Sequence, residues 1–85
     1  MKIQQLFGKV IRRRREKSGV SQEALADKAG LHRNYIGLLE RGLRTPSIDV
    51  LRKLAVGLNT TMSSLIGELE RFLIKSTRSG KSESD

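Results

Sequence analysis

The sequence has no cysteine and only one histidine among its 85 residues, so several kinds of site are excluded at the start. Without cysteine there can be no disulfide and no thiolate metal site, and one histidine cannot form a metal centre by itself. No glycine-rich phosphate loop is present, and Glu16, Glu23 and Asp27 have the spacing of surface charges on helices. We therefore expect no enzyme, no cofactor and no metal.

Long apolar runs, proline and tryptophan are also scarce. No stretch approaches the roughly 18 apolar residues of a membrane span, so we expect a cytoplasmic protein that does not enter a membrane. Proline occurs once, tryptophan never, and no segment alternates like a β-strand. The sequence predicts an all-α protein of five helices, with one domain over residues 1–75 and a disordered polar tail over residues 76–85.

Positive charge is abundant and unevenly distributed. The net charge is +8, and residues 1–44 hold eleven Lys or Arg against four Asp or Glu, whereas residues 76–85 are neutral. A positive field concentrated on one half of a small domain attracts a polyanion such as nucleic acid. A solvated basic face that keeps the domain soluble explains the composition equally well, so charge alone does not decide between the two.

Residues 21–44 have the pattern of two short helices joined by a tight turn, which is a helix-turn-helix. Ser21 can cap the first helix, and Gly30 can end it because glycine adopts the positive φ that such a turn needs. A second helix of about three turns follows, from Leu31 to Gly42. Four residues are expected to close a small core within this motif: Ala26, Gly30, Ile36 and Leu39. Three side chains are expected to face outward, where they fit a DNA major groove: Arg33, Asn34 and Tyr35.

Three further helices are predicted at about residues 5–18, 48–58 and 62–75, the second of them capped by Ser47 and with Ile48 on its inner face. The first helix contains four consecutive arginines, residues 12–15, which fan around the helix and cannot all face one partner. We expect Arg15 to form a partly buried ion pair with Glu40, fastening the first helix to the recognition helix.

The last helix carries a longer apolar seam than a core of this size is expected to cover. An exposed strip of that length indicates a partner surface, so we expect this helix to pair with its copy around a two-fold axis. Packing within one chain is the alternative. The residues assigned to the homodimer interface are Leu65, Leu69, Phe72 and Leu73.

Over about residues 7–73 the chain resembles the lambda-repressor-like, Xre-type helix-turn-helix family. The matching segments include Ser21-Gln22-Glu23, Ala29-Gly30, Leu39-Glu40-Arg41-Gly42 and Pro46-Ser47. Within that family, the small size, the Leu31-His32-Arg33 opening of the recognition helix and the fifth helix resemble controller proteins of restriction-modification systems. The resemblance implies a dimeric regulator of its own operon that binds double-stranded DNA at a palindromic or pseudo-palindromic operator, with RNA polymerase as a candidate partner.

The resemblance also implies roles for residues of the motif. Gln22 would bond a phosphate and brace the recognition helix, and Arg33 would be the leading base reader, since a guanidinium can bond guanine O6 and N7 together. Asn34 and Tyr35 would contact bases or the adjacent backbone. Gly37 would let the helix lie close to the groove.

Three more positions are interpreted through the resemblance. Arg44 and Thr45, in the loop after the motif, would hold a phosphate or reach a central base. His32 stands where many relatives have a capping Ser, Asp or Thr, so it would either meet the DNA backbone or face solvent. Arg14 stands where an apolar residue is common, and we expect its methylenes to cover the core.

Two other classes of regulator stay open, and a membrane-binding function is disfavoured. A phage-type repressor shares most of the same residues. An antitoxin that binds another protein would normally need an extra segment to wrap its toxin, and the tail here is short and polar. A basic membrane-binding helix over residues 9–17 fits poorly with the capped helix-turn-helix that follows it.

Overall fold

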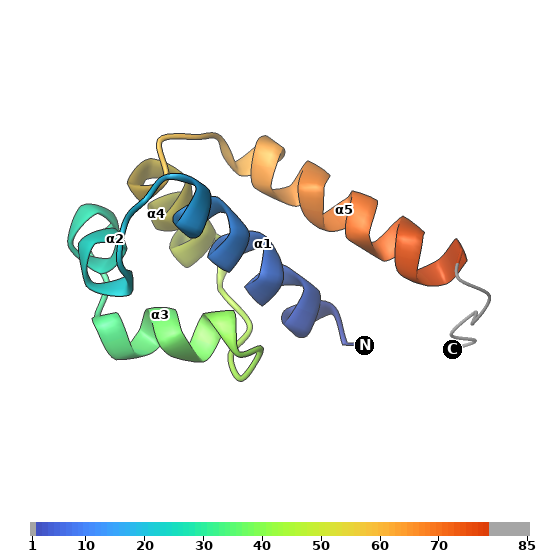
Figure 1. Cartoon of the computed structure of the whole chain (residues 1–85), viewed down its shortest axis with the longest axis horizontal. Helices are drawn as coiled ribbons and strands as arrows, with labels where there is room; N and C mark the ends of the chain where they lie inside the picture. Colours follow the sequence, from blue (N-terminus) through green and yellow to red (C-terminus); the bar gives the residue numbers. More distant parts are fainter. Residues whose placement is uncertain (1, 79–85) are drawn as a thin grey trace.

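The computed structural model describes residues 2–78, and within that range it contains five helices and no strand, which confirms the all-α prediction (Figure 1). The described part measures 39 × 22 × 21 Å along its principal axes. The helices are α1 (Ile3–Lys17), α2 (Gln22–Ala29), α3 (Arg33–Glu40), α4 (Ile48–Gly57) and α5 (Met62–Arg78).

Helix α1 occupies the centre of the fold. It packs against α3 on one side and against α5 on the other, while α2 packs against both α3 and α4. Figure 1 shows α3 and α5 on opposite sides of α1, with α5 running in the opposite direction to α1. A change at α5 therefore reaches the recognition helix α3 mainly through α1.

The first four helices all end in the same way. A residue at positive φ follows each helix, and the next backbone N–H donates to the carbonyl five residues earlier, which is the Schellman arrangement. Glycine adopts positive φ without the strain that a Cβ brings, and Asn is the commonest substitute. The four residues are Gly19, Gly30, Gly42 and Asn59.

Ser21 and Ser47 cap α2 and α4 as the sequence predicts. Each hydroxyl accepts a hydrogen bond from the backbone N–H three residues later, at 3.0 Å for Ser21 and 3.1 Å for Ser47. His32 precedes α3 without a side-chain capping bond. The N-terminus of α3 is thus left without the cap that begins α2.

One core joins all five helices, and the predicted motif core forms part of it. Ala26, Ile36 and Leu39 are buried, whereas Gly30 lies exposed in the turn. Because three of the four expected residues come together here, α2 and α3 share one apolar contact surface. The side chains with less than 2% exposure are Val10, Ile11, Leu25, Ile36, Leu39, Leu54 and Leu65.

Several predicted boundaries were wrong. Helix α1 begins at Ile3 rather than Gln5, because the Gln5 side chain turns back to accept a hydrogen bond from Lys2 N–H. Helix α3 begins at Arg33 rather than Leu31, since His32 keeps an extended backbone with ψ 143°. Helix α5 continues to Arg78, three residues into the expected tail, and residues 79–85 lie outside the described part.

Candidate nucleic-acid interface

Helix α3 borders, along its whole length, a hollow of about 970 Å³ that is also lined by the C-terminal part of α1 and the start of α2. Four of the predicted DNA-binding residues meet around this hollow: Gln22, Arg33, Asn34 and Gly37. Arg33 and Asn34 are exposed, as expected for side chains that read a groove. We call this hollow with its lining residues the reading face.

The expected ion pair between Arg15 and Glu40 is present and forms part of the lining of the reading face. Arg15 Nε and Nη2 donate to the two carboxylate oxygens of Glu40 at 2.6 and 3.1 Å, and Arg15 Nη1 donates to Val20 O at 2.9 Å. The two side chains are only 13% and 4% exposed. The hydrogen bond to Glu40 raises the pKa of Arg15 above its ordinary value, so the guanidinium remains charged.

Gln22 joins α2 to the same carboxylate. Its Nε2 donates to Glu40 Oε1 at 3.0 Å, so one residue of α3 holds both the end of α1 and the start of α2. A Cβ built on Gly37 would lie 3.8 Å from the Gln22 side chain, which is ordinary contact distance. The missing side chain at Gly37 keeps the reading face open beside Gln22.

The backbones of α1 and α3 approach closely at Gly8. A Cβ on Gly8 would lie 2.4 Å from Leu39 O and 2.6 Å from Glu40 O. These distances are too short for a side chain, so any residue other than glycine would force one of the two helices to move. Gly8 is buried, and the sequence offered no signal for it beyond a glycine inside a helical pattern. It sets the distance between α1 and the C-terminal end of the recognition helix.

The other predicted DNA-binding residues lie outside the hollow. His32 and Arg44 are exposed. Tyr35 is half-buried and packs against the core, one helical turn before the buried Leu39, so it does not project freely as expected. Thr45 is exposed but borders an apolar groove on a different part of the surface.

Two arginines that the sequence reasoning did not select also line the reading face. Arg12 is exposed and paired with Glu16 at 3.0 Å, and Arg41 is exposed with its Nε donating to Gly37 O at 3.3 Å. Arg41 follows Arg33 and Gly37 at four-residue steps, and this period on one helix face was the available signal. For Arg12 there was no such signal, because the sequence alone does not show which of the four consecutive arginines faces this hollow. That depends on how α1 packs.

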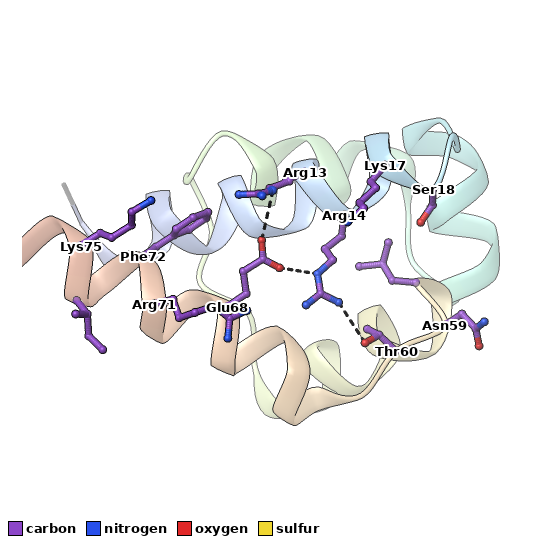
Figure 2. A pocket seen from close by; sticks show the side chains of 12 residues that line it. Arg13, Arg14, Lys17, Ser18, Asn59, Thr60, Glu68, Arg71, Phe72 and Lys75 are labelled. Carbon is purple, nitrogen blue, oxygen red and sulfur yellow. Dashed lines mark hydrogen bonds and ion pairs between the residues drawn. The ribbon is translucent and has the colours of Figure 1, made fainter.

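On the opposite side of α1, Arg14 does not simply lay its methylenes on the core. Its Nε donates to Glu68 Oε1, and its Nη1 donates to Thr60 Oγ1 at 3.2 Å (Figure 2). Its Nη2 donates to Ser64 Oγ at 3.0 Å. Glu68 is only 8% exposed. Within the arginine run, Arg15 thus connects α1 to α3, and the neighbouring Arg14 connects α1 to α5.

The predicted homodimer residues need correction, because α5 packs closer to the core than expected. Leu65 has no exposed surface and Leu69 is 7% exposed, so both belong to the core of one chain, and assigning Leu65 to an interface was wrong. Phe72 and Leu73 are half-buried. Ile3, Ile48 and Ile66 are exposed near the start of this seam, and Ile74 is exposed farther along α5. Placing Ile48 on the inner face was therefore also wrong.

Comparison with known proteins gives a consistent result. Residues 11–65 match the helix-turn-helix family. Control protein C.BamHI of Bacillus amyloliquefaciens is 42% identical over 65 residues, covering 75% of this chain and 80% of the relative, and control protein C.SmaI of Serratia marcescens is 39% identical over 66 residues, covering 78% and 79%. The crystal structure of restriction-modification controller protein C.AhdI from Aeromonas hydrophila superposes with a TM-score of 0.71 at 40% identity, covering 73% and 94%.

The chain belongs to the Xre-type helix-turn-helix family of DNA-binding transcriptional regulators, whose members are not enzymes. Within that family it is of the restriction-modification controller type. Both the fold and the class therefore agree with the expectations from sequence. Among residues 2–78, no helix has the length and apolar character needed to cross a membrane.

Proposed function

We propose that two copies of this chain form a homodimer that binds an inverted-repeat operator and controls a restriction-modification operon that includes its own gene. The main support for this proposal is the reading face. Arg33 and Asn34 are exposed at the start of α3, and the hydrogen bonds of Glu40 to Arg15 and Gln22 hold this helix in place. The names of the relatives, control proteins and restriction-modification controller proteins, support the choice of operon.

The residues of the reading face divide into two roles. Arg33 can bond guanine O6 and N7 in the major groove, and Asn34 can contact a neighbouring base or the backbone. Gln22, Arg12 and Arg41 surround them and are suited to phosphates, which position the protein without selecting a sequence. His32, Tyr35, Arg44 and Thr45 lie outside this hollow and stay proposed contacts.

An apolar groove supports the dimer. It holds about 230 Å³ and lies between the start of α1, the start of α4 and the middle of α5. Ile3, Ile48 and Ile66 are 50%, 76% and 42% exposed around it. Exposed branched apolar side chains gathered from three helices are costly to leave in water, and a second copy would bury them together with the flank of Leu69. Phe7, Pro46 and Leu51 also line the groove.

The dimer is tested by sedimentation equilibrium of the full chain and an Ile66→Glu variant. We expect the unchanged chain to be dimeric and the variant to be monomeric with unchanged helix content, because a carboxylate would have to be buried between two copies. Val56→Glu is the matched control, since Val56 is 64% exposed on α4 and lies outside the groove. A monomeric unchanged chain, or equal effects of the two variants, would contradict the proposed surface.

The operator is tested by footprinting the DNA upstream of the chain's own gene. We expect protection of two half-sites in inverted orientation, with centres about 34 Å apart, one turn of B-DNA. Changing either half-site alone should weaken binding of the dimer. Protection of a single half-site, or equal binding to unrelated duplexes, would overturn the operator part of the proposal while leaving the dimer test to stand separately.

A further inference from the structure

A second hollow lies between α1, α5 and the α4–α5 loop (Figure 2). Helices α3 and α5 lie on opposite sides of α1 (Figure 1), so this hollow is on the side of α1 that faces away from α3. It has a volume of about 730 Å³. Cations from both helices line it, and we call it the basic cleft. These residues are Arg13, Arg14 and Lys17 of α1 and Arg71 and Lys75 of α5.

The positive charge of the basic cleft is balanced only in part. Arg14 and Arg13 share one carboxylate, Glu68, and Arg13 reaches it only at 3.8 Å with a side chain that is 66% exposed. Within residues 2–78, no carboxylate lies within 4.0 Å of Lys17, Arg71 or Lys75. Five cations therefore surround one acidic group, and the excess charge attracts an anionic partner.

The cations form two rows, one on α1 and one on α5, and each row has regular spacing. Arg13 and Lys17 are four residues apart on α1, as are Arg71 and Lys75 on α5, which places the members of each row about 6 Å apart along the helix. In an extended peptide, alternate side chains on one face recur about every 6.6 Å. Carboxylates at alternate positions of such a peptide would match the spacing of either row.

We propose that the basic cleft binds an acidic segment of another protein while the reading face holds DNA. Leu58 and Ile74 also line the cleft and supply apolar surface that an apolar side chain of the same segment can cover. Because α1 separates the cleft from α3, a duplex on the reading face leaves the cleft accessible. This inference needs neither the dimer nor the operator proposed above.

Two features favour a peptide over a nucleic acid as the ligand. The Arg13 guanidinium carbon lies 6.0 Å from the centroid of the Phe72 ring, so a cation already occupies the aromatic face on which a base would stack. The carboxylate of Glu68 sits inside the cleft and would repel a continuous chain of phosphates. A peptide can place its acidic groups to either side of Glu68, whereas a nucleic acid strand cannot omit a phosphate.

The test is a titration of the ¹⁵N-labelled full chain with an eight-residue peptide that has glutamate at alternate positions and leucine or serine between. We expect amide shifts at residues 13, 17, 60, 71 and 75 and little change in α3. The same peptide with glutamine in place of glutamate should not bind. Parallel titrations with an eight-nucleotide oligothymidine and with inorganic phosphate separate the other anionic ligands.

A pair of variants locates the binding. Arg71→Gln with Lys75→Gln should weaken the peptide about three- to ten-fold, since two exposed ion pairs are lost. Arg52→Gln with Lys53→Gln removes the same charge from α4, where both residues pair with Asp49, and should leave the peptide affinity unchanged. Circular dichroism confirms that both variants fold.

Four results would overturn the inference. Equal losses in the two variants, or shifts spread over α3 as well, would show only general attraction to a basic protein. Tighter binding of oligothymidine in the cleft would make it a nucleic-acid site. The same shifts with phosphate alone would reduce it to a small-anion site.

Discussion

Arg15 and Glu40 are joined by two hydrogen bonds across the α1–α3 contact, at 2.6 and 3.1 Å, although the residues are 25 positions apart in sequence. The same carboxylate accepts a hydrogen bond from Gln22. Glu40, which belongs to α3, therefore connects this helix to α1 and to α2. Because both members of the ion pair are almost buried, either one left alone would be a charge without a partner.

Glu40→Gln is expected to lower the free energy of unfolding by about 2–4 kcal/mol, since Arg15 would keep its charge in a mostly buried position. Chemical denaturation followed by circular dichroism measures this loss. Glu16→Gln is the matched control because it removes a carboxylate from an exposed pair, with Arg12, and should change stability by less than about 0.5 kcal/mol. Equal losses would show that Glu40 has no special structural role.

Gly8→Ala is expected to destabilise the fold by about 1–3 kcal/mol or more, because the new methyl group would lie 2.4 Å from Leu39 O and the backbone must move. Gly67→Ala provides the contrast. It also lies within a helix, but the nearest atom to its new methyl group is Arg71 Nη1 at 3.8 Å. This variant should gain about 0.5–1 kcal/mol from helix propensity. Thermal unfolding should shift in opposite directions for the two variants.

Glu68→Gln tests the attachment of α5 to α1. Arg14 is 24% exposed and would lose its charged partner, so we expect a loss of about 1–3 kcal/mol, smaller than for a fully buried pair. Glu70→Gln, on the exposed side of the same helix, should change stability by less than about 0.5 kcal/mol. The two unfolding curves distinguish a specific role for Glu68 from a general effect of negative charge on α5.

Arg33→Ala and Arg41→Ala should separate base reading from phosphate binding. Arg33→Ala is expected to weaken the binding free energy for operator DNA by about 1–3 kcal/mol and to reduce the preference for operator over random duplex. Arg41→Ala should weaken both duplexes alike and lower the slope of log affinity against log salt by about one. Fluorescence anisotropy over a range of salt measures both quantities. An unchanged preference in Arg33→Ala would remove its reading role.

Local chemistry explains why much of this molecule was predictable. Ser21, Gly30 and Ser47 act through bonds to residues within five positions of themselves, so their sequence context was sufficient to place caps and turns. The helical spacing of Ile36 and Leu39 likewise marked the buried side of α3. The Arg15–Glu40 pair was accessible to sequence reasoning because helical periodicity brings Arg14 and Arg15 near the inner face of α1, where Glu40 is an available partner.

The sequence by itself determined the class of fold, the helix-turn-helix and the exposed start of α3, since these follow from periodicity and from residues with special backbone preferences. The tertiary structure decided the assignment of Arg14 to Glu68, the burial of Leu65 and the place of Arg12 and Arg41 on the reading face. These depend on the angle and depth at which α5 and α3 pack on α1. That packing is set by close contacts between distant segments, such as Gly8 against Leu39, which no local pattern encodes.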